Sequence, residues 1–244
     1  MQYLRGWRAL MADPEWKGKV GVATVLILST IFIPVLGQLA LAGWMTLVLR
    51  RAALGQDTPL PPLPFNLGYL KELLTLGFKP FLAQLLYSIP FILMAMLFGC
   101  FGGIINVIAA RGDGGPWLAI VFAVFMLLYL TVTLLTVPLM TVASMRASLT
   151  DDLKAAIGFK PVVAMTKAMF KDILVGGFVM ALITTPIMML GMIACYVGIF
   201  PAAVIITVMQ VYFHAELYRR YLEKGGQPLP IGAVDVGAAA LATG

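Results

Sequence analysis

The sequence carries little formal charge, since only 11% of its 244 residues are Asp, Glu, Lys or Arg. Soluble domains carry about a quarter charged residues, so a water-soluble globular domain is excluded. Charge is missing altogether from four long stretches, residues 20–49, 81–110, 116–145 and 173–213, which together make up more than half of the chain. About 20 apolar residues in a helix cross the hydrocarbon core of a bilayer. The composition therefore predicts an all-α, polytopic membrane protein.

Residue types that carry catalysis and metal binding are also scarce. The sequence has one histidine, His214, and Glu216 two positions later does not share its helix face. The two cysteines, Cys100 and Cys195, lie in apolar runs, where a thiol behaves as a small hydrophobic group. The sequence has no glycine-rich phosphate loop, no nucleophile and base set, and no ionisable group at membrane depth. We therefore expect no enzymatic activity, no metal and no cofactor.

The basic residues lie beside the apolar runs. The net charge is +6, but these residues form no separate basic patch. This placement indicates anchors at an anionic membrane surface rather than a nucleic-acid interface. No cleavable signal peptide is predicted, because the first apolar run follows Lys17 and Lys19, lacks a small-residue cleavage site and continues to Leu49.

The first uncharged run is too long for one straight span, because residues 20–49 would make a helix of about 45 Å. Near its midpoint Pro34 interrupts helical hydrogen bonding, and Gly37 can supply the positive φ of a turn. The alternative is one tilted span with a proline kink. Short cytoplasmic loops collect Lys and Arg. With a hairpin here, Arg111 is the only basic residue on the extracytoplasmic side of the membrane. With a single crossing, the four basic residues that precede residue 20 also lie on that side, so the hairpin is favoured.

The last uncharged run is long enough for two crossings, with a turn at residues 198–201. We therefore predict a single membrane domain over residues 1–222, a multi-pass transmembrane helical bundle with both termini in the cytoplasm, and a cytoplasmic tail over residues 223–244. Six hydrophobic segments form three hairpins in this bundle, and the first two are short for full spans and could be re-entrant. Their approximate ranges are 20–33, 36–50, 81–109, 117–145, 173–194 and 198–218.

Three further segments, near residues 2–11, 67–79 and 150–172, combine apolar and basic residues at helical spacing. In the third, Phe159 and Phe170 can enter the acyl boundary while four lysines reach lipid headgroups: Lys154, Lys160, Lys167 and Lys171. Each segment is an interfacial amphipathic helix or, equally, an ordinary cytoplasmic helix packed on the bundle. The tetrapeptide Gly-Phe-Lys-Pro at residues 77–80 and 158–161 raises the hypothesis of an internal duplication, although the flanking residues do not align.

The polar side chains inside the apolar runs are amides and hydroxyls. Such groups bond within or between helices without needing a substrate. The alternative is a polar path lined by Gln84, Asn106 and Gln210. Four glycines predict close helix packing, within this chain or with another membrane protein: Gly99, Gly103, Gly191 and Gly198.

A set of short motifs lies within residues 9–64. They are Asp13-Pro14-Glu15-Trp16, Ile33-Pro34-Val35-Leu36-Gly37, Gly43-Trp44, Arg50, Gly55 and Leu60-Pro61. This set resembles a family of prokaryotic membrane proteins, Domain of Unknown Function 4013, and the resemblance continues to about residue 222 by composition alone. The chain departs from the family at Trp44, where tyrosine is expected, and at residues 62–65, where an acidic stretch with tryptophan is more usual. The resemblance implies a helical protein of the prokaryotic inner membrane and no catalytic or ligand residue.

Two functions fit these observations, and the sequence favours the first over the second. The first is a non-catalytic subunit or scaffold that packs against membrane lipids and other membrane proteins, or against a second copy of itself. It is favoured by the absence of buried charge and by the glycine-bearing helices. The second is a carrier of an uncharged or lipid-like solute, favoured by prolines inside the apolar segments. A deep polar cavity or a lipid-filled groove would favour the second over the first.

Overall fold

The computed structural model describes residues 1–33, 35–110, 116–150, 152–193 and 197–235. These residues are helical with connecting loops and contain no strand, which confirms the all-α prediction. The helices are α1 (Arg5–Ala12), α2 (Trp16–Ser29), α3 (Leu36–Ala53), α4 (Leu67–Ala110), α5 (Pro116–Leu149), α6 (Leu153–Ile157), α7 (Phe159–Ile193) and α8 (Ile199–Glu223).

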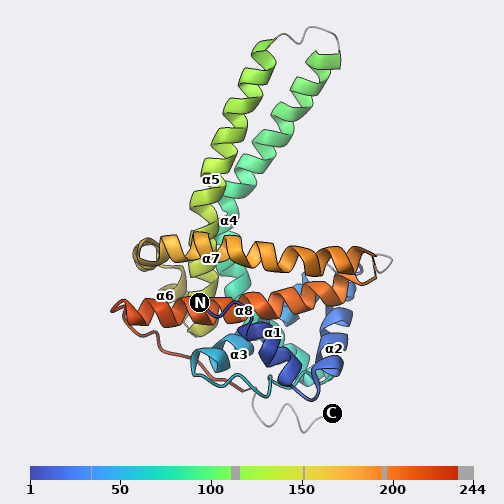
Figure 1. The fold of residues 1–244 in the computed structure, drawn as a ribbon, viewed down its shortest axis with the longest axis vertical. Coiled ribbons are helices and arrows are strands. Elements are labelled where there is room, and N and C mark those ends of the chain that lie inside the picture. The colour runs from blue at the N-terminus through green and yellow to red at the C-terminus, as the bar shows by residue number, and fades with distance from the viewer. Residues whose placement is uncertain (34, 111–115, 151, 194–196, 236–244) are drawn as a thin grey trace.

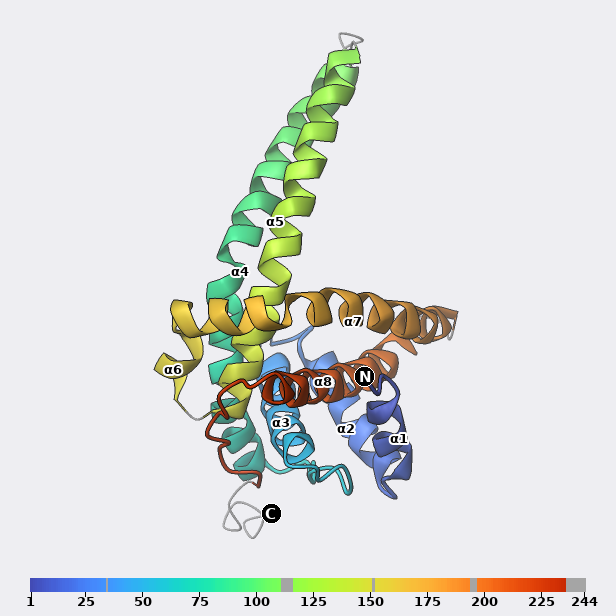
Figure 2. The same ribbon diagram turned by 60° about the vertical axis from the view of Figure 1, so that its left-hand side comes forward.

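The longest helices, α4 and α5, form an antiparallel hairpin whose far half projects from the rest of the molecule (Figures 1 and 2). Aromatic pairs join the two helices along this half, including Phe98 with Phe122 at 6.0 Å and Phe101 with Phe125 at 4.4 Å between ring centroids. The outer faces consist of exposed apolar side chains such as Leu97 and Leu127. A helix that is apolar on all sides and uncovered by protein is suited to lipid.

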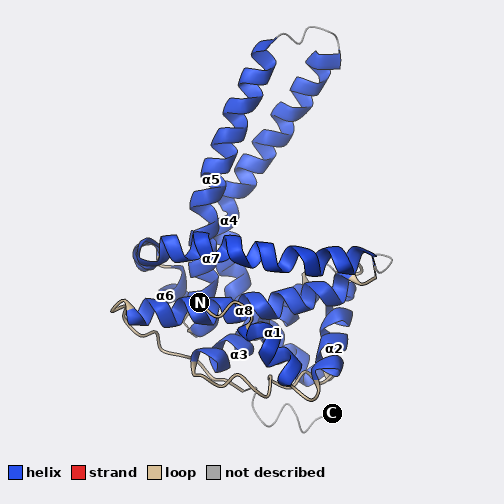
Figure 3. Ribbon diagram, viewed as in Figure 1, coloured by secondary structure: helices blue, strands red, loops and turns tan. Residues whose placement is uncertain are grey.

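The remaining helices and the near ends of α4 and α5 form the body of the molecule, coloured by secondary structure in Figure 3. In this body α7 lies across the base of the hairpin, and α8 runs antiparallel to α7 on its far side (Figures 1 and 2). The core contains Trp44 and Leu47 from α3 and Met209 and Leu217 from α8, all almost fully buried. Helix α8 is therefore enclosed, with α1, α2, α3 and α7 packed around it.

Four of the described helices are long and apolar enough to cross a membrane, namely Leu67–Ile105 of α4 together with α5, α7 and α8. This finding supports the expected membrane protein, but six segments in three hairpins are not confirmed. Segments 20–33 and 36–50 correspond to α2 and α3, which have only 14 and 18 residues. Much of α3 is buried in protein, because it packs on α2, α4, α5 and α8.

Two predicted boundaries differ from the structure. Segments 67–79 and 81–109 form one continuous helix, α4, with Pro80 inside it. Segment 150–172 divides into α6 and the start of α7, and α7 continues without a break to Ile193. Pro161 lies in the first turn of α7, where its missing N–H removes no helical bond. The two Gly-Phe-Lys-Pro copies thus occupy different places, a helix interior and a helix start, which speaks against a structural duplication.

The chain reverses direction between α2 and α3, but the turn is not built as expected. Pro34 lies outside the described residues. The positive φ belongs to Val35, at 83°, and not to Gly37. Gly37 is already helical, and a Cβ there would collide with the carbonyl oxygen of Leu26. Its lack of a side chain therefore permits the close contact between α2 and α3.

Candidate functional site

A cavity of about 630 Å³ lies between α3, α4, α5 and α8. Each helix contributes polar side chains to the lining. Gln84 and Ser88 come from α4, and Ser144 and Ser148 come from α5. Residues four apart share one face of a helix, so each pair forms a short polar stripe in an otherwise apolar wall.

The α8 wall carries a longer polar stripe, Thr207, Gln210 and His214, spaced three and four residues apart. Gln38 of α3 faces the same cavity. The Thr207 hydroxyl donates a hydrogen bond to the carbonyl oxygen of Ala203, one turn earlier in the helix, at 2.8 Å.

A second cavity of about 460 Å³ adjoins the first, on the side of α7. The two share lining from three helices through Gln84, Ser144 and Gln210, and the second adds Thr141 and Thr184. A band of amide and hydroxyl groups therefore continues from one cavity to the next. The larger volume is within the range of about 300–1,000 Å³ that ligand pockets occupy.

The chemistry of the lining is uncharged. Among the described residues, neither cavity is lined by Asp, Glu, Lys or Arg, and His214 is the single titratable side chain in either wall. Such walls offer hydrogen bonds to hydroxyl, carbonyl or amide groups and apolar contact to hydrocarbon, but no counter-ion for a charged solute. In the described part of the chain, no three His, Cys, Asp or Glu side chains come together where they could hold a metal ion.

The polar residues singled out by sequence are placed unequally. Gln84 and Gln210 line both cavities. Asn106 lies 22 residues beyond Gln84 on the continuous helix α4, which separates the two by about 33 Å along the helix axis. The three residues therefore do not form one path. His214, the one histidine of the sequence, also lines both cavities.

The predicted lysine anchors lie on the surface: Lys154, Lys160, Lys167 and Lys171 are all exposed. The predicted packing glycines fall into two groups. A Cβ on Gly191 would lie 2.7 Å from the carbonyl oxygen of Gly198, so the missing side chain of Gly191 permits α7 to approach the backbone at the start of α8. Gly99 and Gly103 have nothing within 4 Å of an added Cβ, because they lie on the projecting half of α4.

A close contact between α3 and α4 was not anticipated. A Cβ on Gly43 would collide with the carbonyl oxygen of Leu73, and a Cβ on Gly77 would collide with that of Leu39. The two glycines thus allow α3 and α4 to touch through their backbones. This contact fixes the spacing of two helices that line the larger cavity. Gly43 was visible in the motif set, but nothing in the sequence indicated its partner.

The motif residues form the support of the site rather than its lining. Asp13 is 1% exposed, and its carboxylate accepts hydrogen bonds from Lys19 Nζ at 2.8 Å, from the Glu15 N–H at 2.8 Å and from the Leu60 N–H at 2.7 Å. Burial alone would raise the pKa of the Asp13 carboxyl, but these donors outweigh it and hold the pKa below its usual value. Lys19 also donates to the Leu60 carbonyl oxygen at 2.9 Å.

The loop that contains Leu60, residues 54–66 between α3 and α4, is also held to these two helices by hydrogen bonds. The indole N–H of Trp44 donates to the Pro61 carbonyl oxygen at 3.1 Å, and the Tyr69 hydroxyl donates to that of Pro62 at 2.6 Å. The Asp-Pro-Glu-Trp segment and the Leu60-Pro61 exit are therefore parts of one structural joint, which connects α2, α3 and the start of α4.

Arg50 is the buried cation of the set. Its Nε donates to the Ser148 carbonyl oxygen at 2.7 Å, in the last turn of α5, and its Nη1 donates to that of Ala233 at 2.8 Å. The Gly232 N–H donates a hydrogen bond to the Leu149 carbonyl oxygen at 2.8 Å. The C-terminal segment thus returns from α8 across the end of α5 as far as the structure describes it.

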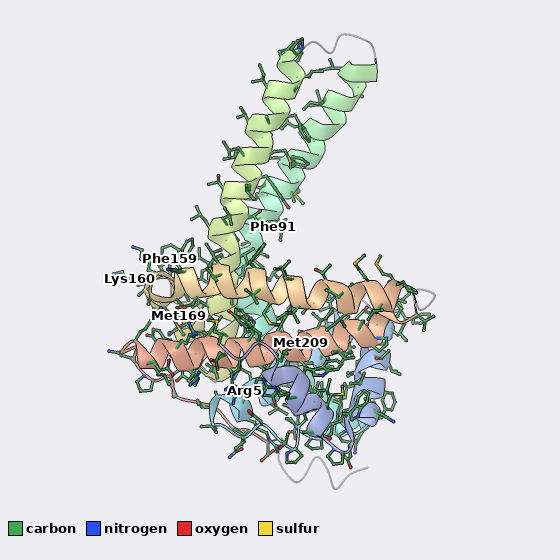
Figure 4. All side chains as sticks on the ribbon, in the orientation of Figure 1. Arg5, Phe91, Phe159, Lys160, Met169 and Met209 are labelled. Atoms are coloured by element: carbon green, nitrogen blue, oxygen red, sulfur yellow. The ribbon has the colours of Figure 1, made fainter. Side chains whose placement is uncertain are left out.

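A second polar cluster lies where α1 meets α8. Arg5 pairs with Asp57 through Nη2 at 2.6 Å, and this hydrogen bond raises the pKa of the Arg5 guanidinium. The Tyr212 hydroxyl donates to the Asp57 carbonyl oxygen at 2.7 Å. Figure 4 shows Arg5 on the side of the body away from the hairpin. The cluster of Arg5 and Asp57 therefore lies away from the apolar projection.

Comparison with known proteins agrees with the motif set. The profile of the family described as "Protein of unknown function (DUF4013)" matches residues 26–214, more than three quarters of the chain. The match begins after the Asp13-Pro14-Glu15-Trp16 segment. Searches of curated proteins and of solved structures gave no match. The chain belongs to the DUF4013 family of proteins of unknown function.

Proposed function

We propose that this chain is a non-catalytic integral membrane protein of the prokaryotic inner membrane, with both termini in the cytoplasm, that binds an uncharged, lipid-like solute for carriage. The uncovered apolar hairpin supports membrane insertion. The placement of the basic residues at the ends of the uncharged runs supports the orientation.

The observation that carries the solute-binding role is the uncharged polar cavity. Stripes of amides and hydroxyls from three helices converge on a space large enough for a single-chain amphiphile. Apolar walls with a few convergent polar groups are typical of small-molecule sites. The sequence favoured a scaffold over a carrier, and this cavity is the feature that reverses the preference.

A scaffold role keeps one supporting observation. Gly99 and Gly103 lie four residues apart on the projecting half of α4, and nothing in the described chain lies close to them. Small residues at this spacing allow two membrane helices to pack closely. Partner membrane proteins, or a second copy of the chain, would then contact the hairpin.

The solute-binding role can be tested with a fluorescent monoacylglycerol, which has one acyl chain and an uncharged glycerol head. The probe is titrated into purified protein in nanodiscs, with unlabelled monooleoylglycerol and lysophosphatidylglycerol as competitors. We expect saturable binding that the uncharged competitor displaces at much lower concentration than the anionic one. A Gln84→Leu, Gln210→Leu double variant should bind at least tenfold more weakly, because two hydrogen bonds are lost at about 1 kcal/mol each.

The matched control is Thr131→Val. Thr131 lies on α5 outside both linings, and its hydroxyl bonds to Leu127 of the same helix. This control should bind as the wild type does. Absence of saturable binding by the wild type, or full binding by a correctly folded double variant, would overturn the proposal.

A further inference from the structure

Helix α7 lies at the boundary between the body and the projecting hairpin. Figures 1 and 2 both show it along the edge of the body from which the hairpin rises, with α8 on its other side. Among the described elements it packs on α5, α6 and α8. One long face of α7 therefore points away from the body.

The buried and exposed residues of α7 separate cleanly by helical position. The face toward the body carries buried side chains such as Met165, Met169 and Met180. The opposite face carries Phe178, Leu182 and Met189, which are 67%, 60% and 59% exposed. These three residues recur at spacings of four and seven, so they form a single stripe along the helix.

The same stripe continues into the first half of α7, where its exposed side chains are basic instead of apolar. Lys160, Lys167 and Lys171 are exposed and lie in register with Phe178, at spacings of seven, four and seven residues. We name this surface, from Lys160 to Met189, the α7 stripe. Its lysines complement anionic headgroups, and its apolar residues can enter the acyl boundary. Figure 4 shows Phe159 and Lys160 at the start of α7.

The length of the hairpin fits this arrangement. Phe91 lies just beyond α7 on the projecting half (Figure 4). From Phe91 to Ala110, α4 has 20 residues, which measure about 30 Å, the thickness of a bilayer hydrocarbon core. The full 44 residues of α4 would measure about 66 Å, twice what one crossing needs.

A second apolar feature lies on the same side of the body. The turn between α2 and α3 exposes Ile31, Phe32 and Ile33, at the end of these helices nearer to α7 (Figure 2). The ion pair of Arg5 with Asp57 lies away from this side (Figure 4). Uncovered apolar residues from three separate parts of the chain therefore share one side.

We propose that the α7 stripe lies flat on an anionic lipid bilayer, and that the α4–α5 hairpin alone crosses the hydrocarbon core. In this arrangement α7 does not span the membrane although it is long and apolar enough to do so. A helix that lies across the base of a spanning hairpin cannot itself be parallel to that hairpin. The inference does not depend on the solute-binding role of the cavities.

The test measures the depth of single fluorophores in phosphatidylglycerol and phosphatidylethanolamine vesicles. Cys100 and Cys195 are first replaced by serine. Single cysteines labelled with an environment-sensitive dye are then placed at Lys171, Leu182 and Met189 of α7, and depth is measured by quenching with lipids that carry quenchers at different positions. We expect all three positions at one shallow depth, within a few ångströms of each other.

Two controls and one opposing outcome make the test decisive. Labels at Leu97 and Ile104 on the hairpin should both lie about 5 Å from the bilayer centre, deeper than every α7 label. If α7 spans the membrane, Leu182 will lie about 16 Å deeper than Lys171, and the proposal fails. In phosphatidylcholine vesicles, quenching at Leu182 should fall at least twofold, and unchanged quenching would remove the role assigned to the lysines.

Discussion

The joint around Asp13 provides the sharpest test of how the fold is held together. Replacing Asp13 with alanine removes the carboxylate and leaves the ammonium of Lys19, only 6% exposed, without its close anionic partner. Glu15 remains at 3.7 Å, but its own side chain is largely in solvent. The N–H groups of Glu15 and Leu60 also lose their acceptor.

The expected cost follows from this burial. Breaking a buried ion pair by removing one partner costs about 3–5 kcal/mol, because an uncompensated charge stays buried. At roughly 2–4 °C for each kcal/mol in a chain of this size, the Asp13→Ala variant should unfold about 10 °C lower than the wild type. The loop at residues 54–66 should loosen first, since Lys19 and Asp13 both bind Leu60.

Thermal unfolding in mild detergent, followed by tryptophan fluorescence, measures the loss. A Lys19→Met variant and the double variant complete a thermodynamic cycle. Since the charge and its partner are removed together, the double variant should be more stable than Asp13→Ala alone. A Tm for Asp13→Ala within 2 °C of the wild type would refute the assigned role of this pair.

The pH dependence of stability tests the same joint without a large change in packing. The folded pKa of Asp13 lies below its usual value, so the carboxylate stabilises the fold above the unfolded pKa. This contribution should disappear as the pH falls through the folded pKa. In an Asp13→Asn variant, Tm should therefore decrease less as the pH falls than it does in the wild type. The same dependence of Tm on pH in both proteins would contradict the lowered pKa of Asp13.

Two further predictions concern packing. Gly43→Ala should lower the free energy of unfolding by at least 2 kcal/mol, because its Cβ would collide with the backbone at Leu73. The control Gly99→Ala has open space around it and should be neutral or stabilise α4 by about 0.5–1 kcal/mol. Equal effects of the two substitutions on thermal unfolding in detergent would disprove the contact. Arg50→Lys keeps the charge but loses the fork that joins Ser148 to Ala233, so hydrogen exchange in residues 229–235 should accelerate at least tenfold, and unchanged protection would exclude this link.

Much of the fold could be predicted because apolar length is a local property. The uncharged runs correctly indicate long helices at α4, α5, α7 and α8. The boundaries failed where charge was taken as a helix end. Lys79 and Pro80 lie inside α4, and Lys171 lies inside α7. A charged residue ends a membrane span, but it does not end a helix that continues outside the lipid.

The cavity was only partly predictable. Gln84 and Gln210 were singled out because amides are rare in apolar runs, and the structure brings both to the same walls. Ser144, Ser148 and Thr207 were missed, although polar residues that line the cavity recur every three or four positions on α4, α5 and α8. Which stripes face one another depends on how α4, α5 and α8 pack, and no single segment contains that information.

Apolar content alone also does not distinguish a helix that spans lipid from one that is enclosed by protein. Helices α5 and α8 both pass a test of length and composition, yet only 6% of the apolar window of α5 is buried in the body, against 56% for α8. The difference arises from neighbours: α8 is surrounded by α1, α2, α3 and α7, whereas among the described helices the far half of α5 packs on α4 alone. Helix α7 is intermediate, buried on one side and exposed along the α7 stripe. The exposed side of α7 has lysines along its first half and apolar residues along its second half. This pattern fits a helix at a membrane surface, where one side of the helix contacts lipid and the other side contacts protein.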